Sequence, residues 1–196
     1  NMHDKLKQLN NLPESLTYLS CNGNNISQLD HLPPNIEELH CISNKITQLD
    51  NLPNSIKILH CEFNNISQLG VNGNLPQNLV ELYCNNNGLT EIEHLPPHLK
   101  ILDCCNNKIT QLDNLPASLV YLDCNNNNLT HFDNLPENLT YLTCIENKIT
   151  QLDNLPASLG LTFSALDVAM CLLLCNLYYS IRLIYLKMAS KSISLL

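Results

Sequence analysis

The sequence predicts a solenoid, a curved right-handed coil with short parallel β-strands on its concave face and an extended, polyproline-like convex side. The dipeptide Leu-Pro recurs every 20 residues, with one step of 23, at Leu12, Leu32, Leu52, Leu75, Leu95, Leu115, Leu135 and Leu155. A cysteine keeps the same spacing, at Cys21, Cys41, Cys61, Cys84, Cys104, Cys124 and Cys144. Units this short cannot bury their own apolar side chains, so neighbouring units must stack around a shared core.

Each unit is expected to contribute one short strand. In the first unit, Leu19 and Cys21 alternate with polar residues, which places them on the inward side of an extended segment. The residues expected to line the core there are Leu16, Leu19, Cys21, Ile26 and Leu29. Proline lacks an N–H group and restricts the residue before it, so each Leu-Pro disfavours a helix on the return side.

A recurring asparagine follows each strand. Its amide can both donate and accept, so we predict that it bonds backbone groups of adjacent turns. This structural column comprises Asn24, Asn44, Asn64, Asn87, Asn107, Asn127 and Asn147. The preceding residue, Asn106 for example, is expected to face solvent and to matter little for stability.

The seven recurring cysteines are predicted to be buried, reduced and apolar in character. A zinc site is not favoured, because the repeats contain no C-x-x-C pair and the sulfurs form one column. Cys105 differs, since it alternates outward and is expected to be a surface thiol. Free buried thiols fit a reducing compartment, and no signal peptide opens this chain, so an intracellular location is predicted.

The unit reads L-P-x-[SN]-[LI]-x-x-L-x-C-x-x-N-x-[LI]-x-x-[LIF]-x-x, and one copy is filled by Leu119, Leu122, Cys124, Asn127, Leu129 and Phe132. Over residues 6–159 this resembles the leucine-rich repeat, with cysteine at an inward leucine position. The short unit is similar to the repeats of bacterial secreted effectors and of giant-virus proteins, and its Asn/Ile-rich form is closer to the viral kind. A viral origin would imply the host cytoplasm. The ubiquitin-ligase domain of the bacterial effectors is not expected, because 37 residues after Leu159 cannot hold it.

Two parts of the chain are predicted. Residues 1–159 form the solenoid, with a partial repeat over 1–11 and then about seven units. The segment 5–13 matches 45–53, so the chain opens inside a repeat and a truncated N-terminus is expected. Residues 147–159 are identical to 107–119, after which the pattern stops and an apolar tail spans 160–196. The tail is a helix that caps the solenoid, a membrane anchor through residues 161–186, or the scar of a shifted reading frame.

The outward side of the strands is the candidate binding surface, here called the strand face. It comprises three columns, which read Tyr18, Glu38, Ile58, Glu81, Ile101, Tyr121, Tyr141; Ser20, His40, His60, Tyr83, Asp103, Asp123, Thr143; and Asn22, Ile42, Glu62, Asn85, Cys105, Asn125, Ile145. These positions hold five acids, four tyrosines and no lysine or arginine, which favours a protein partner with a basic surface. The predicted contact residues are Tyr18, Glu38, His40, His60, Glu81, Tyr83, Asp103, Tyr121, Asp123 and Tyr141.

The net charge and the absence of catalytic motifs narrow the classes of function that the sequence allows. The net charge is −8, and an acidic body argues against nucleic acid as a partner. The chain has no G-x-S-x-G, P-loop or H-E-x-x-H motif, so we expect no catalysis, cofactor or metal site. The sequence therefore predicts a non-enzymatic protein–protein interaction module. Two alternatives stay open, namely a structural or decaying repeat segment without a ligand, and a membrane-anchored surface or virion protein.

Overall fold

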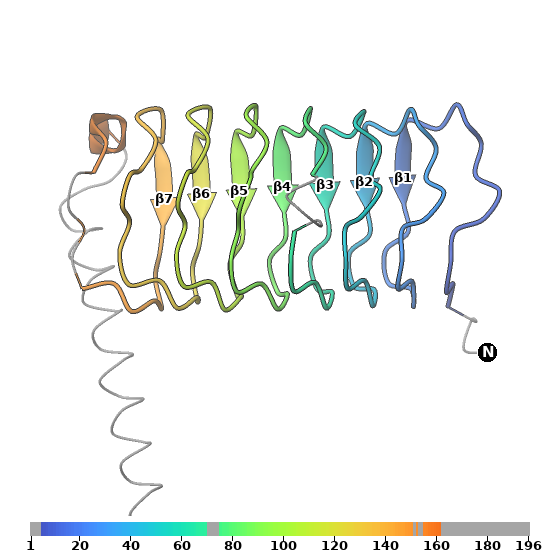
Figure 1. The fold of residues 1–196 in the computed structure, drawn as a ribbon, viewed down its shortest axis with the longest axis horizontal. Coiled ribbons are helices and arrows are strands. Elements are labelled where there is room, and N and C mark those ends of the chain that lie inside the picture. The colour runs from blue at the N-terminus through green and yellow to red at the C-terminus, as the bar shows by residue number, and fades with distance from the viewer. Residues whose placement is uncertain (1–4, 70–74, 151, 153–154, 162–196) are drawn as a thin grey trace, which may run out of the picture.

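The computed structural model describes residues 5–69, 75–150, 152 and 155–161. Seven three-residue strands lie side by side along the molecule (Figure 1). They are β1 (Tyr18–Ser20), β2 (Glu38–His40), β3 (Ile58–His60), β4 (Glu81–Tyr83), β5 (Ile101–Asp103), β6 (Tyr121–Asp123) and β7 (Tyr141–Thr143). A short 3-10 helix, η2 (Ala157–Leu161), follows the last strand.

The strands form one parallel sheet whose spatial order is the chain order, β1 to β7. Equivalent residues pair directly, as Leu19 does with Leu39, so one repeat makes one turn of the coil. The three-residue insertion falls between β3 and β4, yet Leu59 still pairs with Leu82. The insertion therefore leaves the strand register on both sides intact, and the predicted solenoid is confirmed.

Columns of leucine and isoleucine fill the core. The central strand leucines Leu39, Leu59, Leu82, Leu102 and Leu122 are completely buried. Two residues expected in the core, Leu16 and Leu19, are only partly buried. They belong to the first complete unit, where less of the chain stacks on the outer side, so the core thins toward that end.

The asparagine column forms a hydrogen-bond ladder between turns. The Asn44 Nδ2 donates to the carbonyl oxygens of Cys41 and Cys21, both at 3.0 Å. Its Oδ1 accepts from the Ile26 N–H at 3.0 Å. The same three bonds recur at Asn107, toward Cys104, Cys84 and Leu89. Each amide thus satisfies buried backbone groups of its own turn and of the turn before it.

The inward cysteines form a second ladder. Their thiols are buried and are not joined in disulfides. The Cys61 Sγ donates to the Tyr83 carbonyl oxygen of the next strand at 3.3 Å, and the Cys104 Sγ donates to that of Asp123 at 3.4 Å. Burial raises the pKa of these thiols well above 9.0. Cys61 and Cys104 therefore pack as neutral thiols, and each also donates a hydrogen bond to the last carbonyl oxygen of the next strand.

One or two left-handed positions in each described unit close the coil. One directly precedes the asparagine column, with φ of 55° at Ser43 and 54° at Phe63, and the other directly precedes a Leu-Pro, with φ of 61° at His31. Asn106 is exposed, as expected, but its φ is 53° and its Oδ1 accepts from Asn126 Nδ2. The small effect expected of its side chain on stability stays a prediction. Few side chains tolerate this conformation, so these positions constrain the sequence.

The return segments contain turns and bends without helix or strand in the described part, as the Leu-Pro units predict. The predictions for the tail, a cap helix, a membrane anchor or a frameshift scar, fall on residues 162–196, which lie outside the described residues. In the part that is described, no helix has the length and apolar character needed to cross a membrane. The boundary at residue 159 stays a prediction.

Candidate functional site

The strand face presents its side chains in three parallel columns. Every strand from β2 to β6 has a buried central leucine flanked by two half-exposed residues, and Tyr18 and Tyr141 at the ends are 50% and 46% exposed. Direct pairing of equivalent residues brings side chains that are 20 or more residues apart into contact across the sheet. All ten predicted contact residues lie on this face.

Four rings form a row across β1 to β4. The His40 ring lies 5.3 Å from Tyr18 and 4.4 Å from His60. His60 stacks on Tyr83 at 4.2 Å, with only 3° between the ring planes. Such stacks hold their members in fixed rotamers, which lowers the entropy that a partner's binding would cost.

Carboxylates hold the rings of this row. The His40 Nε2 lies 2.7 Å from Glu38 Oε1, and the His60 Nδ1 lies 2.9 Å from Glu62 Oε1. The Tyr83 hydroxyl donates to Glu81 Oε2 at 3.0 Å, and burial together with this carboxylate raises the pKa of Tyr83 to about 12. Glu62 was not among the predicted contact residues. The alternation that placed His60 outward also places Glu62 outward, in the third column. The sequence could therefore have predicted Glu62 as a contact residue.

A second aromatic pair covers β6 and β7. Tyr121 and Tyr141 stack at 4.4 Å with 1° between their planes. Burial, followed by the charge of Asp123, raises the pKa of Tyr121 to about 12, so its hydroxyl stays protonated at neutral pH. The pair therefore presents two stacked, preorganised hydroxyl-bearing rings at the end of the face.

Between the two aromatic groups lies an acidic cluster of Asp103, Cys105 and Asp123, whose ligand atoms lie within 4.8 Å of one another. This set could hold a metal ion, an arrangement not predicted from the sequence. However, Asp103 Oδ1 and Oδ2 accept from the Cys105 N–H and from Asn85 Nδ2, and Asp123 Oδ1 accepts from the Asn125 N–H.

Burial, followed by the charges of Asp103 and Asp123, raises the pKa of the Cys105 thiol to about 12. A thiol must lose its proton to bind a metal, and three of the four carboxylate oxygens already have donors. We therefore assign no metal to this cluster. Cys105 is half-buried rather than a plain surface thiol, and its raised pKa predicts low reactivity.

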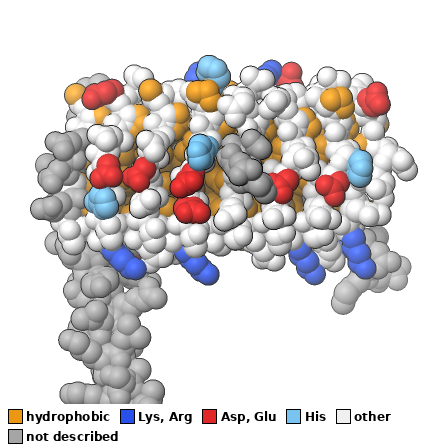
Figure 2. All heavy atoms as spheres, viewed as in Figure 1, with side chains coloured by type: hydrophobic (Ala, Val, Ile, Leu, Met, Phe, Trp, Pro, Cys, Tyr) orange, Lys and Arg blue, Asp and Glu red, His pale blue; other side chains and the backbone are white. Residues whose placement is uncertain are grey.

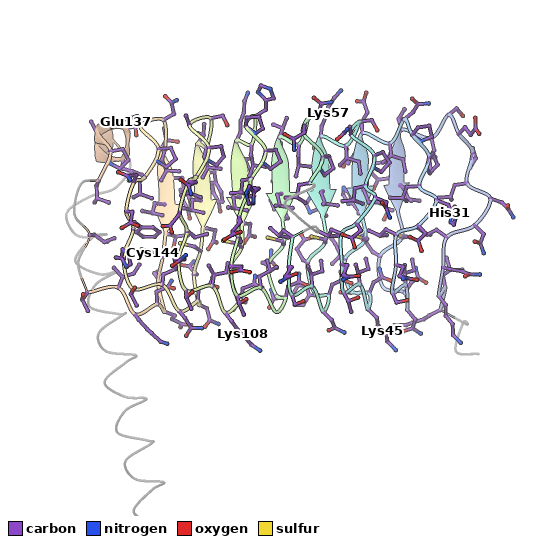
Figure 3. The ribbon with its side chains drawn as sticks, in the orientation of Figure 1. His31, Lys45, Lys57, Lys108, Glu137 and Cys144 are labelled. Carbon is purple, nitrogen blue, oxygen red and sulfur yellow. The ribbon has the colours of Figure 1, made fainter. Side chains whose placement is uncertain are left out.

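Basic side chains lie along the edges of the solenoid. Figure 3 places Lys45 and Lys108 along the edge where the strands end, and Lys57 along the opposite edge. In the view of Figure 2, acidic side chains and histidines form a band along the molecule between these lysines, on the return side, where Figure 3 places His31; the strand face points away from the viewer. Lys57 pairs with Glu37 at 2.9 Å, outside the strand face. Among the described residues, none of the five acids of the strand face contacts a lysine.

Comparison with known proteins agrees with this architecture. Residues 77–117 match the family model described as leucine-rich repeats, two copies. The structure is similar to YopM from Yersinia enterocolitica, with a TM-score of 0.67 and 34% identity over 79% of this chain and 38% of that one. It is also similar to the functional domain of InlJ from Listeria monocytogenes, with a TM-score of 0.58 and 32% identity over 74% of this chain and 39% of that one.

A Shigella effector domain matches with a TM-score of 0.52 and 26% identity, over 72% of this chain and 55% of that one. No curated protein matches the sequence significantly. The chain thus covers less than two thirds of each of these relatives. The 20-residue units thus build a leucine-rich-repeat solenoid, similar to those of bacterial effectors. The InlJ structure is described as including a cysteine ladder, which this chain also has. The likeness to giant-virus repeats stays a prediction.

Proposed function

We propose that the protein is a non-enzymatic module that binds another protein through its strand face. The observation that carries the proposal is the make-up of this face, where two stacked aromatic groups flank an acidic cluster and no lysine neutralises the acids. Tyrosine gives large contact area at low entropic cost and is enriched at protein interfaces. The structural likeness to effector leucine-rich-repeat proteins supports the same class of function.

The partner is proposed to present a basic, partly apolar surface. Five unneutralised acids attract such a surface over several ångströms and speed its encounter, while stacked rings supply the buried contacts that slow dissociation. The binding residues are proposed to be Tyr18, Glu38, His40, His60, Glu81, Tyr83, Asp103, Tyr121, Asp123 and Tyr141. The buried thiols, which are not joined in disulfides, support a reducing, intracellular compartment for this function.

Site-specific photo-crosslinking tests which face binds. A photoreactive phenylalanine replaces Tyr121 on the strand face in one full-length variant, and exposed Gln111 in a return segment in another. In a lysate of cells that make the protein, we expect one partner to crosslink from position 121 and not from position 111. Crosslinking from position 111 alone, or equally from both, would contradict the strand-face proposal.

The stacked tyrosines are expected to be the main anchors. Tyr121→Ala combined with Tyr141→Ala should weaken partner binding by more than about 2 kcal/mol, mainly through faster dissociation. Neither ring belongs to the core, so the thermal unfolding curve should change little. Surface plasmon resonance with the crosslinked partner measures both rates, and higher salt should slow association alone. Val120→Ala, an exposed neighbour, is the control. An unchanged affinity in the double variant would refute the tyrosine anchor.

A further inference from the structure

Glu62 carries an unsatisfied carboxylate oxygen on the strand face. The residue is only 9% exposed. Its Oε1 lies 2.9 Å from His60 Nδ1, which must be the donor because an ionised carboxylate can only accept. Its Oε2 is buried and has no hydrogen-bond partner among the described residues. A buried charged oxygen without a donor is unfavourable, so this position lacks a hydrogen-bond donor that a ligand can supply.

The ring side chains beside Glu62 are engaged with other carboxylates. His40 is engaged with Glu38 through its Nε2, and the Tyr83 hydroxyl donates to Glu81. When a histidine is neutral and donates from one ring nitrogen, the other nitrogen is an acceptor. The cluster across β2 to β4 therefore offers acceptors and negative charge. Among the described residues, Glu62 forms an ion pair with His60 and with no lysine.

We propose that Glu62 binds a cationic side chain of the partner, a lysine or an arginine, between β2 and β4. On binding, the side chains that cover Glu62 move aside so that the charged group donates to its Oε2, and the aliphatic stem lies along the stacked rings of His60 and Tyr83. A partly buried charge-assisted hydrogen bond is stronger than one in water, and the stacked rings add apolar contact for the stem. This site rests on the proposed function, because it assigns one contact within the strand face.

Small blocked amino acids test the site without a known partner. The probes are Nα-acetyl-lysine methylamide, Nα-acetyl-arginine methylamide and, as the neutral isostere of arginine, Nα-acetyl-citrulline methylamide. They are titrated into the full-length protein with labelled histidine rings, and the NMR signals of His40 and His60 are followed. We expect one or both cationic probes to shift these signals saturably, with affinity at least about tenfold above citrulline. The two cationic titrations show which side chain is preferred.

Glu62→Gln keeps the shape and removes the charge, and it should lower the affinity of the cationic probe at least about tenfold. Glu137→Gln makes the same charge change at an exposed residue near the opposite end of the solenoid and should leave the affinity unchanged (Figure 3). Equal binding of citrulline and arginine with no response to lysine, or unchanged binding in Glu62→Gln, would overturn the site. The comparison of the cationic probes with citrulline uses the native protein, so it tests the cation site even if Glu62→Gln unfolds.

The two proposals fail separately. If the probes do not bind but the partner still crosslinks from position 121, the cation site is wrong and the strand face stands. If the probes bind at Glu62 but the partner crosslinks only from position 111, the cation site stands as a small-cation site and the proposed function is wrong.

Discussion

At the scale of single residues, the side chain that most determines the coil is the repeated asparagine. Asn107 joins three backbone groups in two turns, through the carbonyl oxygens of Cys84 and Cys104 and the N–H of Leu89. No other side chain of the unit carries both a donor and an acceptor at this place. The asparagine therefore replaces the sheet hydrogen bonds that the turn after each strand lacks.

Replacing Asn107 should be costly. Asn107→Ala leaves these buried backbone groups unpaired and should lower the free energy of unfolding by about 1–3 kcal/mol. Lys108→Ala, its exposed neighbour, should cost about 0.5 kcal/mol or less. Urea unfolding of the two variants measures the difference. Equal effects would mean that the asparagine column does not hold the turns.

At the scale of elements, the backbone after each strand adopts the left-handed conformation whichever side chain the unit carries there. Gly23 occupies this position in the first unit with φ of 70°, whereas Phe63 occupies it with φ of 54° and is 56% exposed. An aromatic residue disfavours this conformation, while asparagine and glycine tolerate it. The third unit therefore retains a strained, exposed phenylalanine directly beside Glu62.

Relieving this strain should stabilise the protein. Phe63→Asn supplies the residue found at the same position in other units, such as Asn86, and should raise the free energy of unfolding by about 0.5–1 kcal/mol. Gly23→Phe makes the opposite kind of change, because it places an aromatic residue at the same left-handed position of another unit. Because no atom lies within 4 Å of the added Cβ, it should cost about 1 kcal/mol through backbone strain alone. Urea unfolding compares both, and a destabilised Phe63→Asn would show that the ring contributes packing instead.

At the scale of the whole molecule, the cysteine ladder links stability to pH along the solenoid. Burial raises the pKa of the Cys41, Cys61, Cys84 and Cys104 thiols well above 9.0. The unfolded chain releases these protons near pH 9, whereas the folded chain keeps them. The folded state thus binds more protons at alkaline pH, so the stabilising contribution is full below pH 9 and is lost as the pH rises above it.

Urea unfolding between pH 8 and 10 tests this linkage. The free energy of unfolding should be nearly flat below pH 9, and above it should approach a fall of about 1.4 kcal/mol per pH unit for each buried thiol. Cys104→Ala should reduce that slope by the share of one thiol, whatever its effect at neutral pH. A slope that is unchanged in Cys104→Ala, or absent in the native protein, would show that the thiols are not buried as neutral groups.

The sequence alone determined the repeat, the strands and the inward columns. Stacked identical units give each repeated position the same surroundings, so the period of 20 and the alternation around Leu39 and Cys41 suffice to place them. The ten predicted contact residues were placed on one face for the same reason. Whether they bind a partner stays a prediction.

The tertiary structure decided what varies from unit to unit. The stack of His60 on Tyr83, the pairing of Glu62 with His60 and the closeness of Cys105 to two aspartates depend on rotamers and on neighbours in the adjacent turn. The left-handed turns at Ser43 and Phe63 were also missed, because neither residue type signals that conformation. Periodicity fixes which residues share a face, but only the packed side chains determine which of them touch and which buried oxygen, that of Glu62, lacks a donor.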